Sequence, residues 1–397
     1  MLDYVQENSD FHLDLTSWRR DLHAHPETAY QEIRTANFIT QVLSEYDVEL
    51  TQGLAGTGVI ATIHGELGDG DAIGLRADMD ALDISELNQF EYCSNYPGKM
   101  HACGHDGHTV MLLGAAICLA KSRQFYGKVH CIFQPAEENE AGAKAMIKDG
   151  LFERFPMKAV YGLHNWPALP VGQAAVHTGP VMAAFDTFDL IVKGEGGHGA
   201  MPNQTVDPIY AASLIVNALQ SIVSRNLDPQ KAGVVSVTQI NAGHAYNVIP
   251  DSVSLKGTTR SFCPEVRDQL EQRMTEIVEH IAKAQGCQAS LTYTRRYPAT
   301  VNHAKQAKQC FAVLSDMAEI SQVLLDPPAS MGGEDFAFML EQCPGAYIWL
   351  GSGDDSHGYN LHHPHFDFND AIIPHGTNFW LKLVKRLLSS PTVNIDQ

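Results

Sequence analysis

Short apolar runs alternate with longer amphipathic stretches over roughly the first 180 residues of the chain. The runs have the length of buried strands, and the stretches between them have the length and spacing of helices. Strands are predicted at 58–64, 72–77, 128–134 and 159–163, and helices at 15–46 (broken at His25-Pro26), 105–122 and 141–150. The glycine-rich segment 65–71 links two predicted strands and does not open a helix, so it is predicted to be a hairpin turn rather than a nucleotide-binding loop. Strands that alternate with helices predict an α/β sheet with helices on both faces.

The pattern changes after about Gly179, and the change predicts an inserted domain. Between Ala184 and Tyr297 the expected order is strand, helix, strand, strand, helix, strand, which is typical of a ferredoxin-like α+β module. Beyond it, a helix near 304–319, a strand at 346–351 and a final helix at 370–388 return to the first style. The predicted fold class is α/β with two domains. A mixed-sheet α/β domain is formed by 1–182 and 297–397, and a ferredoxin-like α+β domain is inserted at 183–296.

Length and charge narrow the class of protein. A chain of 397 residues exceeds what one hydrophobic core usually serves, which agrees with two domains. Its 27 basic and 46 acidic residues give a net charge of -19, which repels nucleic acid and anionic lipid, so neither is expected as a partner.

Residues 1–10 lack the basic and apolar segments of a secretory signal, and the longest apolar stretch, near 110–120, is too short to span a membrane. Eight cysteines with no C-x-x-C pair do not form a disulfide pattern, and we expect a cytoplasmic protein.

The densest candidate chemistry lies between His101 and His108, where three histidines and one cysteine occur together. Cysteine and histidine are ligands of borderline-soft divalent metals. Cys103 and His105 flank a glycine, so the backbone can turn sharply and direct both side chains to one point. A helix is predicted to begin here, and a helix N-terminus lowers the pKa of a nearby thiol toward the thiolate that a metal requires. The alternative interpretation is a polar helix cap with a buried thiol.

Carboxylates and a further histidine follow predicted strands, where α/β sheets place their active-site loops. Glu137 and Glu138 come after the strand at 128–134. Such a pair is commonly just solvated, but beside a metal one carboxylate can be a ligand while the other acts as a general base. His164 is expected to end an apolar strand, and Asp78 and Asp80 come at the end of another, where they can orient metal ligands.

Two other histidine segments are open to more than one interpretation. His362, His363 and His365 share a loop near the C-terminus, which is either a polar loop or a remote source of a metal ligand. His198 stands between glycines in the inserted module, and taken alone it is typical of a surface turn.

Ten blocks in order along the chain resemble one family, the amidohydrolase branch of the aminoacylase and carboxypeptidase-G type metallopeptidases, which includes hippurate hydrolases and auxin-conjugate amidohydrolases. The blocks are D-L-H-A-H-P-E from Asp21, L-R-A-D-M-D-A-L from Leu75, M-H-A-C-G-H-D-G-H from Met100, Q-P-A-E-E from Gln134, G-L-H-N from Gly162, G-G-H-G-A-M-P from Gly196, N-V-I-P from Asn247, G-T-T-R-S-F from Gly257, M-G-G-E-D-F from Met331 and L-H-x-P-H-F from Leu361. They cover nearly the whole chain. Two departures are His363, where the family usually has serine, and Asp83, where many relatives have proline.

The resemblance implies a specific site and reaction. It implies two divalent metal ions, with zinc favoured by the thiol and manganese or nickel as alternatives, held by five ligands: Cys103, His105, Glu138, His164 and His362. Glu137 would be the general base for the water that attacks the amide bond of an N-acyl amino acid, with Asp78 supporting the site. The two-part domain would be catalytic, and the insertion a dimerisation or lid domain of a homodimer.

Three residues of the insertion acquire roles from the same resemblance. His198 would reach the active site of a partner subunit and polarise the scissile carbonyl. Asn247 and Arg260 would bind the substrate's carboxylate or carbonyl, a task that suits the planar fork of arginine.

Other functions remain open on the residues. The same site could serve a dipeptidase or carboxypeptidase, and the same fold could be a non-catalytic metal-binding or ligand-binding protein, although a pure binder has no need of the free carboxylate beside a ligand. A thiol hydrolase with Cys103 as its nucleophile is a further alternative, whereas a serine hydrolase would require a G-x-S-x-G elbow, which the chain lacks.

Overall fold

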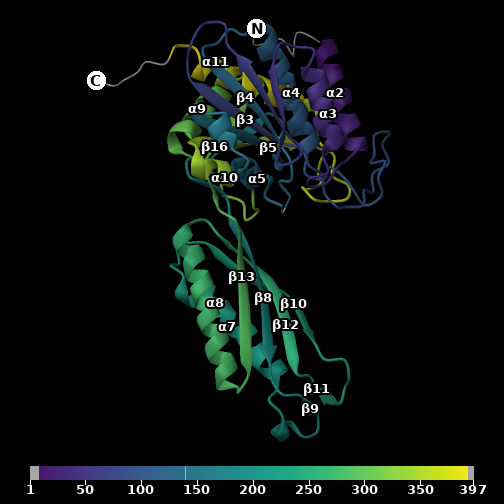
Figure 1. Cartoon of the computed structure of the whole chain (residues 1–397), viewed down its shortest axis with the longest axis vertical. Helices are drawn as coiled ribbons and strands as arrows, with labels where there is room; N and C mark the ends of the chain where they lie inside the picture. The colour runs from purple at the N-terminus through teal and green to yellow at the C-terminus, as the bar shows by residue number, and fades with distance from the viewer. Residues whose placement is uncertain (1–8, 139, 392–397) are drawn as a thin grey trace, which may run out of the picture. The chain divides into compact units, whose positions relative to one another are not determined.

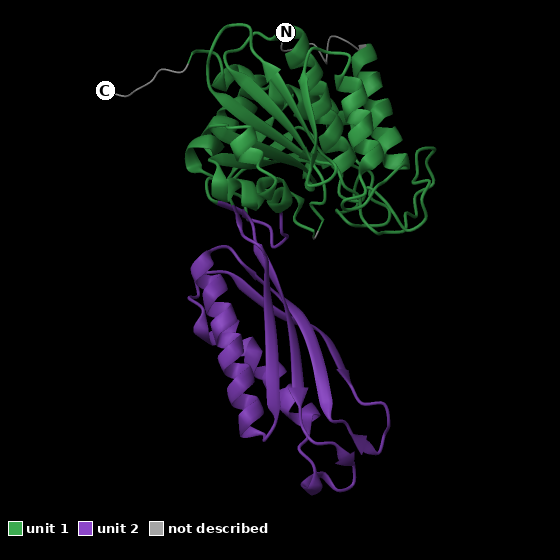
Figure 2. Cartoon of the chain, in the orientation of Figure 1, with its two compact units in different colours: residues 1–179, 301–328, 335–397 green, residues 180–300, 329–334 purple. Residues whose placement is uncertain are grey.

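The computed structural model describes residues 9–138 and 140–391, and the predicted absence of a signal segment at 1–10 falls mostly outside this range. The chain forms two compact units, which Figure 2 colours separately. Unit 1 contains residues 1–179, 301–328 and 335–397, and unit 2 contains residues 180–300 and 329–334. The expected domain limits were 182/183 and 296/297, and the short segment 329–334, expected in the two-part domain, belongs to unit 2.

Unit 1 is organised around an eight-stranded mixed sheet of order β1-β2-β4-β3-β5-β16-β6-β15. The strands are β1 (Glu49–Leu54), β2 (Gly58–His64), β3 (Ala72–Asp78), β4 (Lys128–Gln134), β5 (Ala159–Pro170), β6 (Gln173–Val176), β15 (Gln322–Leu325) and β16 (Gly345–Gly353). β3 runs parallel to β4 and β5, and β16 parallel to β5, whereas β2 is antiparallel to its neighbours β1 and β4. The central strands are apolar on both faces because helices cover both faces.

The predicted hairpin at 65–71 is wrong. β2 and β3 do not pair, because β4 lies between them and pairs with both. The segment crosses the start of β4, where the Gly65 amide donates to the Gly127 carbonyl and the Gly127 amide donates to the Gly68 carbonyl. Strand order depends on pairing between distant segments, and the local turn chemistry at 65–71 carries no information about β4.

Helices pack on both faces of the sheet of unit 1 (Figure 1). Five helices cover one face and form a hydrophobic core with it: α2 (Ser9–Ala24), α3 (Ile33–Leu43), α4 (His105–Ser122), α9 (Ala304–Ser315) and α11 (Ile373–Leu387, preceded by the 3-10 turn η3, Asp370–Ile372). The other face carries α5 (Gly142–Lys148), α6 (Leu151–Arg154) and α10 (Phe336–Gln342). α4 is buried along its length from His105 to Ala120, which suits its run of aliphatic residues.

Unit 2 has the ferredoxin-like order. Its four strands form an antiparallel sheet of order β10-β12-β8-β13, and two helices pack on it. They are β8 (Ala184–Lys193), α7 (Pro208–Ser221), β10 (Gly233–Ala242), β12 (Ser252–Ser261), α8 (Pro264–Ala284) and β13 (Gln288–Tyr297). Short elements add to them: β7 (Pro180–Met182), β9 (Gly197–His198), η1 (Pro202–Gln204), η2 (Ile222–Asn226), β11 (Val248–Ile249) and β14 (Thr300–Val301).

The predicted fold class is confirmed: a mixed α/β unit in parts of the chain that flank an inserted ferredoxin-like α+β unit. Within the described residues, no helix combines the length and the apolarity needed to cross a membrane.

Candidate metal centre

Several elements of unit 1 bring the predicted ligands together at the carboxyl ends of β3 and β4. Cys103 and His105 stand at the start of α4, and Glu137 and Glu138 follow β4. Histidine, cysteine and carboxylate ligand atoms form overlapping groups, each with its atoms within 4.8 Å of one another. Three of these groups consist entirely of predicted ligands and Glu137: Cys103 with His105 and His164, Cys103 with Glu138 and His362, and His105 with Glu137 and Glu138.

Gly104 makes the Cys103–His105 turn possible. It has a φ of 94°, in the left-handed region that favours glycine, and it caps α4. A Cβ at this position would lie 2.3 Å from Oδ1 of Asn165, so the position has neither the conformation nor the space for a side chain. The turn leaves Sγ of Cys103 3.4 Å from Nε2 of His164.

Hydrogen bonds orient His105 toward the cluster. Its Nδ1 lies 2.9 Å from the carbonyl oxygen and 3.2 Å from Oδ1 of Asp80, so Nδ1 carries the proton. Its Nε2 is buried and has no hydrogen-bond partner among the described residues. Burial lowers the pKa of His105, but Asp78 and Asp80 outweigh burial and raise it to about 10. The carboxylates around this ring therefore favour a positive charge at Nε2, which a proton or a metal ion can supply.

The two glutamates take different positions. The Glu138 amide donates to Oδ2 of Asp80 at 3.0 Å, and its Oε1 lies 3.1 Å from Nε2 of His362. Glu137 is buried, and its Oε1 accepts from the amide of Asp335 at 3.3 Å. Glu138 thus faces the other candidate ligands, while Glu137 is held by the start of α10.

Cys103 does not have the lowered pKa that its place before a helix predicted. Burial, followed by the charges of Glu138 and Glu137, raises the pKa of its thiol well above the ordinary value. The helix N-terminus lowers the pKa of the thiol by less than burial and the two carboxylates raise it. Ionisation of Cys103 therefore needs a cation inside the cluster, and this donor set fits a divalent metal.

His164 lies inside β5 and not at its end, because the strand continues to Pro170; the predicted strand end is wrong. Burial, and then the neighbouring His108, hold the pKa of His164 well below its ordinary value. The ring is therefore neutral, the form that binds a metal.

His362 is the histidine of the C-terminal loop that joins the cluster. Its backbone has a φ of 64°, and its amide donates to the carbonyl of Ala102 at 2.7 Å. His363 instead stacks on Tyr359, with ring centroids 4.4 Å apart, and its Nδ1 accepts from the amide of His365. The metal-compatible groups among the described residues contain His362 and not His363.

Behind the ligands lies a second layer of buried polar groups, of which the sequence interpretation gave a supporting role only to Asp78 and Asp80. Oδ1 of Asp78 lies 2.5 Å from Nδ1 of His108, whose Nε2 lies 2.7 Å from Oδ1 of Asn165. Both ring nitrogens of His108 are thus engaged, and the residue supports the site rather than offering a ligand atom. On the other side, Arg76 binds Oδ2 of Asp78 at 2.7 Å and Oδ1 of Asp335 at 3.0 Å.

The loop that carries Glu137 depends on a residue for which the sequence offered no signal. The buried Glu32 accepts from the amide of Ala136 at 2.9 Å and from the hydroxyl of Thr57 at 2.7 Å. Ala136 has a φ of 55°, which is uncommon for alanine. Burial, and then Asp80, raise the pKa of Glu32 to about 7.

The other three predicted residues belong to unit 2, and the structure brings two of them together. His198 and Asn247 are exposed neighbours: β9 pairs with β11, and the Gly199 amide donates to the Asn247 carbonyl at 2.8 Å. Arg260 stands at the far end of β12, with its guanidinium 4.9 Å from the ring centre of Phe185. The eight residue steps from Ser252 to Arg260 span roughly 26 Å, so a single copy of unit 2 keeps Arg260 far from the β9–β11 pair.

Comparison with known proteins identifies the family. The model of peptidase family M20/M25/M40 matches residues 74–386. The chain belongs to this family. It is 41% identical over 374 residues to an N-acetyl-L-cysteine deacetylase of Bacillus subtilis, with 94% of this chain and 88% of the relative covered. It is 38% identical over 388 residues to a hippurate hydrolase of Campylobacter jejuni, with 98% and 100% covered.

A solved structure agrees in both fold and sequence. The YXEP protein of Bacillus subtilis, described as a dinuclear metal binding peptidase of the M20 family, superposes with a TM-score of 0.84 at 35% identity, and the match covers 96% of this chain and 99% of that one. The predicted family and enzyme class are confirmed: the chain is a metal-dependent amidohydrolase of a family with dinuclear metal sites.

Proposed function

We propose that this enzyme hydrolyses the amide bond of N-acyl amino acids at the centre formed by Cys103, His105, Glu138, His164 and His362. The observation that carries the proposal is that these ligand atoms form overlapping groups within 4.8 Å, with the buried Glu137 among them. The names of the relatives support the substrate class, because a deacetylase of N-acetyl-L-cysteine and a hippurate hydrolase both remove an acyl group from an amino acid.

The donor set supports two divalent ions, with zinc favoured by the thiol and the imidazoles, and manganese or nickel as alternatives. Bound here, such ions would lower the pKa of a water molecule in the site. Glu137 would take the proton of that water and return it to the leaving amine. Asp80 would keep the proton of His105 on Nδ1, so that Nε2 faces the ions. Asp78 would hold His108 and the buried guanidinium of Arg76 in place behind the ligands.

We further propose a homodimer in which His198 and Asn247 serve the active site of the partner subunit, while Arg260 binds the carboxylate of the substrate. β12 separates the β9–β11 pair from Arg260 and spans roughly 26 Å from Ser252 to Arg260, more than a small substrate spans, so one copy of unit 2 cannot present both Asn247 and Arg260 to one molecule. β10 is an edge strand of its sheet and exposes Ile240, and such edges are usually covered.

A cytoplasmic location is supported by the cysteines. All eight are free thiols, as expected in a reducing compartment.

The first test is hydrolysis of a panel of N-acetyl, N-benzoyl and indoleacetyl amino acids and of dipeptides, before and after chelation and with metal restored. We expect release of the free amino acid from the acyl substrates, its loss on chelation and its return with zinc or manganese. Faster cleavage of the dipeptides would replace the acyl-amino-acid proposal with a dipeptidase. Activity that survives chelation but not alkylation of thiols would make Cys103 a nucleophile and overturn the metal mechanism.

The dimer has its own test, which mixes two inactive variants. In a mixed dimer of Glu137→Gln and His198→Ala chains, one site would combine an intact Glu137 with an intact His198 from the other chain. Random mixing would then restore about a quarter of the wild-type activity, because half the dimers are mixed and each has one complete site. No recovery on mixing, under conditions where subunits exchange, would contradict the shared site.

A further inference from the structure

Unit 1 has a hollow at the opposite ends of the strands that carry the metal centre. It has a volume of about 470 Å³ and is bordered by Ala72 and Lys128, the first residues of β3 and β4. Asp78 and Gln134, which precede the metal-site loops, are the last residues of the same strands. The hollow is therefore separated from the metal centre by the length of these strands.

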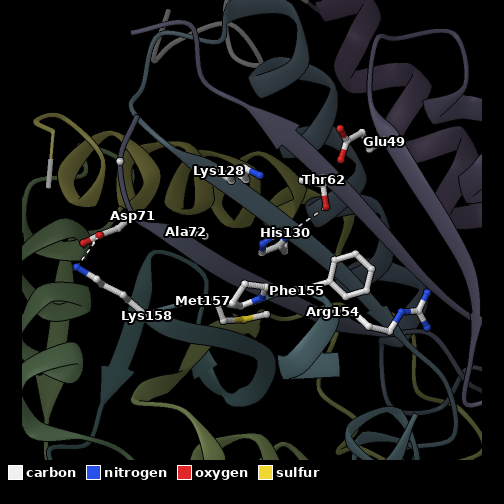
Figure 3. A pocket seen from close by; sticks show the side chains of 12 residues that line it. Glu49, Thr62, Asp71, Ala72, Lys128, His130, Arg154, Phe155, Met157 and Lys158 are labelled. Atoms are coloured by element: carbon white, nitrogen blue, oxygen red, sulfur yellow. Dashed lines mark hydrogen bonds and ion pairs between the residues drawn. The ribbon is translucent and has the colours of Figure 1, made fainter. Parts of the chain in front are cut away.

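The floor of the hollow is polar where a sheet face is usually apolar. Thr62 of β2 and His130 of β4 are directly paired across the strands, and both are only 4% exposed. The Thr62 hydroxyl lies 2.8 Å from Nδ1 of His130, and Figure 3 shows this pair among the side chains that line the hollow. Within the described part of the chain, the Thr62 hydroxyl has no other acceptor, so it donates to Nδ1 of His130. A neutral ring that accepts at Nδ1 carries its proton on Nε2.

The opposite nitrogen of His130, Nε2, is buried and has no acceptor at hydrogen-bonding geometry among the described residues. The carbonyl of Pro156 is close enough to raise the pKa of the ring, but burial and the charge of Lys128 outweigh it and lower that pKa to about 4, so the ring is neutral. A buried donor without an acceptor costs free energy, and a ligand oxygen would relieve that cost.

Two cations at the rim have no carboxylate partner. Lys158 is paired with Asp71 at 2.6 Å, but neither Lys128 nor Arg154 forms an ion pair within residues 9–138 and 140–391. The three cations of the lining outnumber its two carboxylates, Asp71 and Glu49, and a net positive charge is unusual for a chain with a net charge of -19. Phe155 and Met157 give the hollow an apolar wall, and Glu49 adds a second carboxylate to its lining (Figure 3).

We propose that this hollow is a second binding site, which takes a small organic carboxylate with an apolar body. The carboxylate oxygens accept from Nε2 of His130 and lie near Lys128 and Arg154, while the apolar body packs on Phe155. The site does not depend on the proposed reaction, and a carboxylic acid released by amide hydrolysis has the required chemistry.

The test is a ¹⁹F NMR titration of the full-length metal-loaded protein with 4-fluorobenzoate. The double variant Lys128→Gln/Arg154→Gln removes the two rim charges at exposed positions. Its matched control, Lys305→Gln/Lys308→Gln, removes two exposed lysines from α9 and therefore has the same net charge as the rim variant. We expect the rim variant to raise the dissociation constant of one binding component at least about tenfold, and the control to leave that dissociation constant within about twofold of the wild-type value.

Hydrogen–deuterium exchange locates that component. On addition of 4-fluorobenzoate, we expect protection of 128–134 and 151–158 in the wild type and the control, but not in the rim variant. An isotherm and a protection pattern that are the same in the rim variant and the wild type would overturn the proposal, as would the absence of binding up to about 10 mM, which corresponds to negligible affinity. Inorganic phosphate that protects the same segments equally well, with no effect of Phe155→Ser on 4-fluorobenzoate, would reject the apolar part of the site.

Discussion

The buried carboxylate of Asp335 is expected to be a large contributor to the stability of unit 1. Its side chain is fully buried and binds three groups: Nη2 of Arg76 at 3.0 Å, Nε2 of Gln134 at 2.8 Å and the amide of Ala143 at 2.8 Å. Arg76 and Ala143 approach different oxygens of the carboxylate. In Asp335→Asn, only one of the two positions keeps an oxygen, so either the guanidinium or the amide faces an NH₂ group.

The magnitude follows from the burial of Arg76, which is also complete. Breaking a buried ion pair by removing one partner costs about 3–5 kcal/mol, and we expect the lower end of this range because Asp78 remains paired with Arg76. For a unit of this size, about 2–4 °C of thermal midpoint corresponds to each kcal/mol, so we expect a decrease of at least roughly 6 °C. Differential scanning calorimetry of the metal-loaded protein measures it.

The matched control is Glu341→Gln, which makes the same change of charge at an exposed position of α10. A surface change of this kind is expected to stay within about 0.5 kcal/mol. If Asp335→Asn lowers the midpoint no more than Glu341→Gln does, the buried network does not hold the loop of Glu137 in the way described.

Three further predictions concern the centre and its surroundings. Glu137→Gln should retain metal, measured by plasma mass spectrometry, but lose at least about 100-fold in turnover; retained turnover would refute its role as the base. His23 is buried between Asp106 and Glu86, whose hydrogen bonds outweigh burial and raise its pKa to about 9. The contribution of His23 to the free energy of unfolding is thus full below a pH of about 6.5 and is lost as the pH rises through about 9. In urea unfolding, the free energy of unfolding of His23→Gln should therefore change less with pH over this window than that of the wild type. Parallel pH profiles of the two proteins would contradict the assignment. Gly104→Ala should destabilise the protein in urea by clearly more than Gly98→Ala, because both glycines have a positive φ but only the first meets a neighbour, at 2.3 Å; equal losses would show that the turn can relax.

Much of the candidate centre could be predicted from local sequence, because its ligands stand at recognisable points of regular elements. The Cys103–His105 turn lies at the start of a helix whose bounds were predicted as observed, and Glu137 and Glu138 follow a strand predicted with its observed limits. The buried partners could not be predicted. Asp335 reaches Gln134 from a position 201 residues away, and Glu32 reaches Ala136 from 104 residues away.

The sequence by itself determined the elements, the insertion and the kinds of ligand, because hydrophobic periodicity and residue chemistry act over a few neighbours. Only the tertiary structure decided that β4 lies between β2 and β3, and that Glu32 and Asp335 support the loop of Glu137. It also reversed the expected pKa of Cys103, since burial and the charges of Glu137 and Glu138 depend on segments brought together from different parts of the chain. Strand order, desolvation and electric field are properties of the packed molecule, and they have no local signal in the sequence.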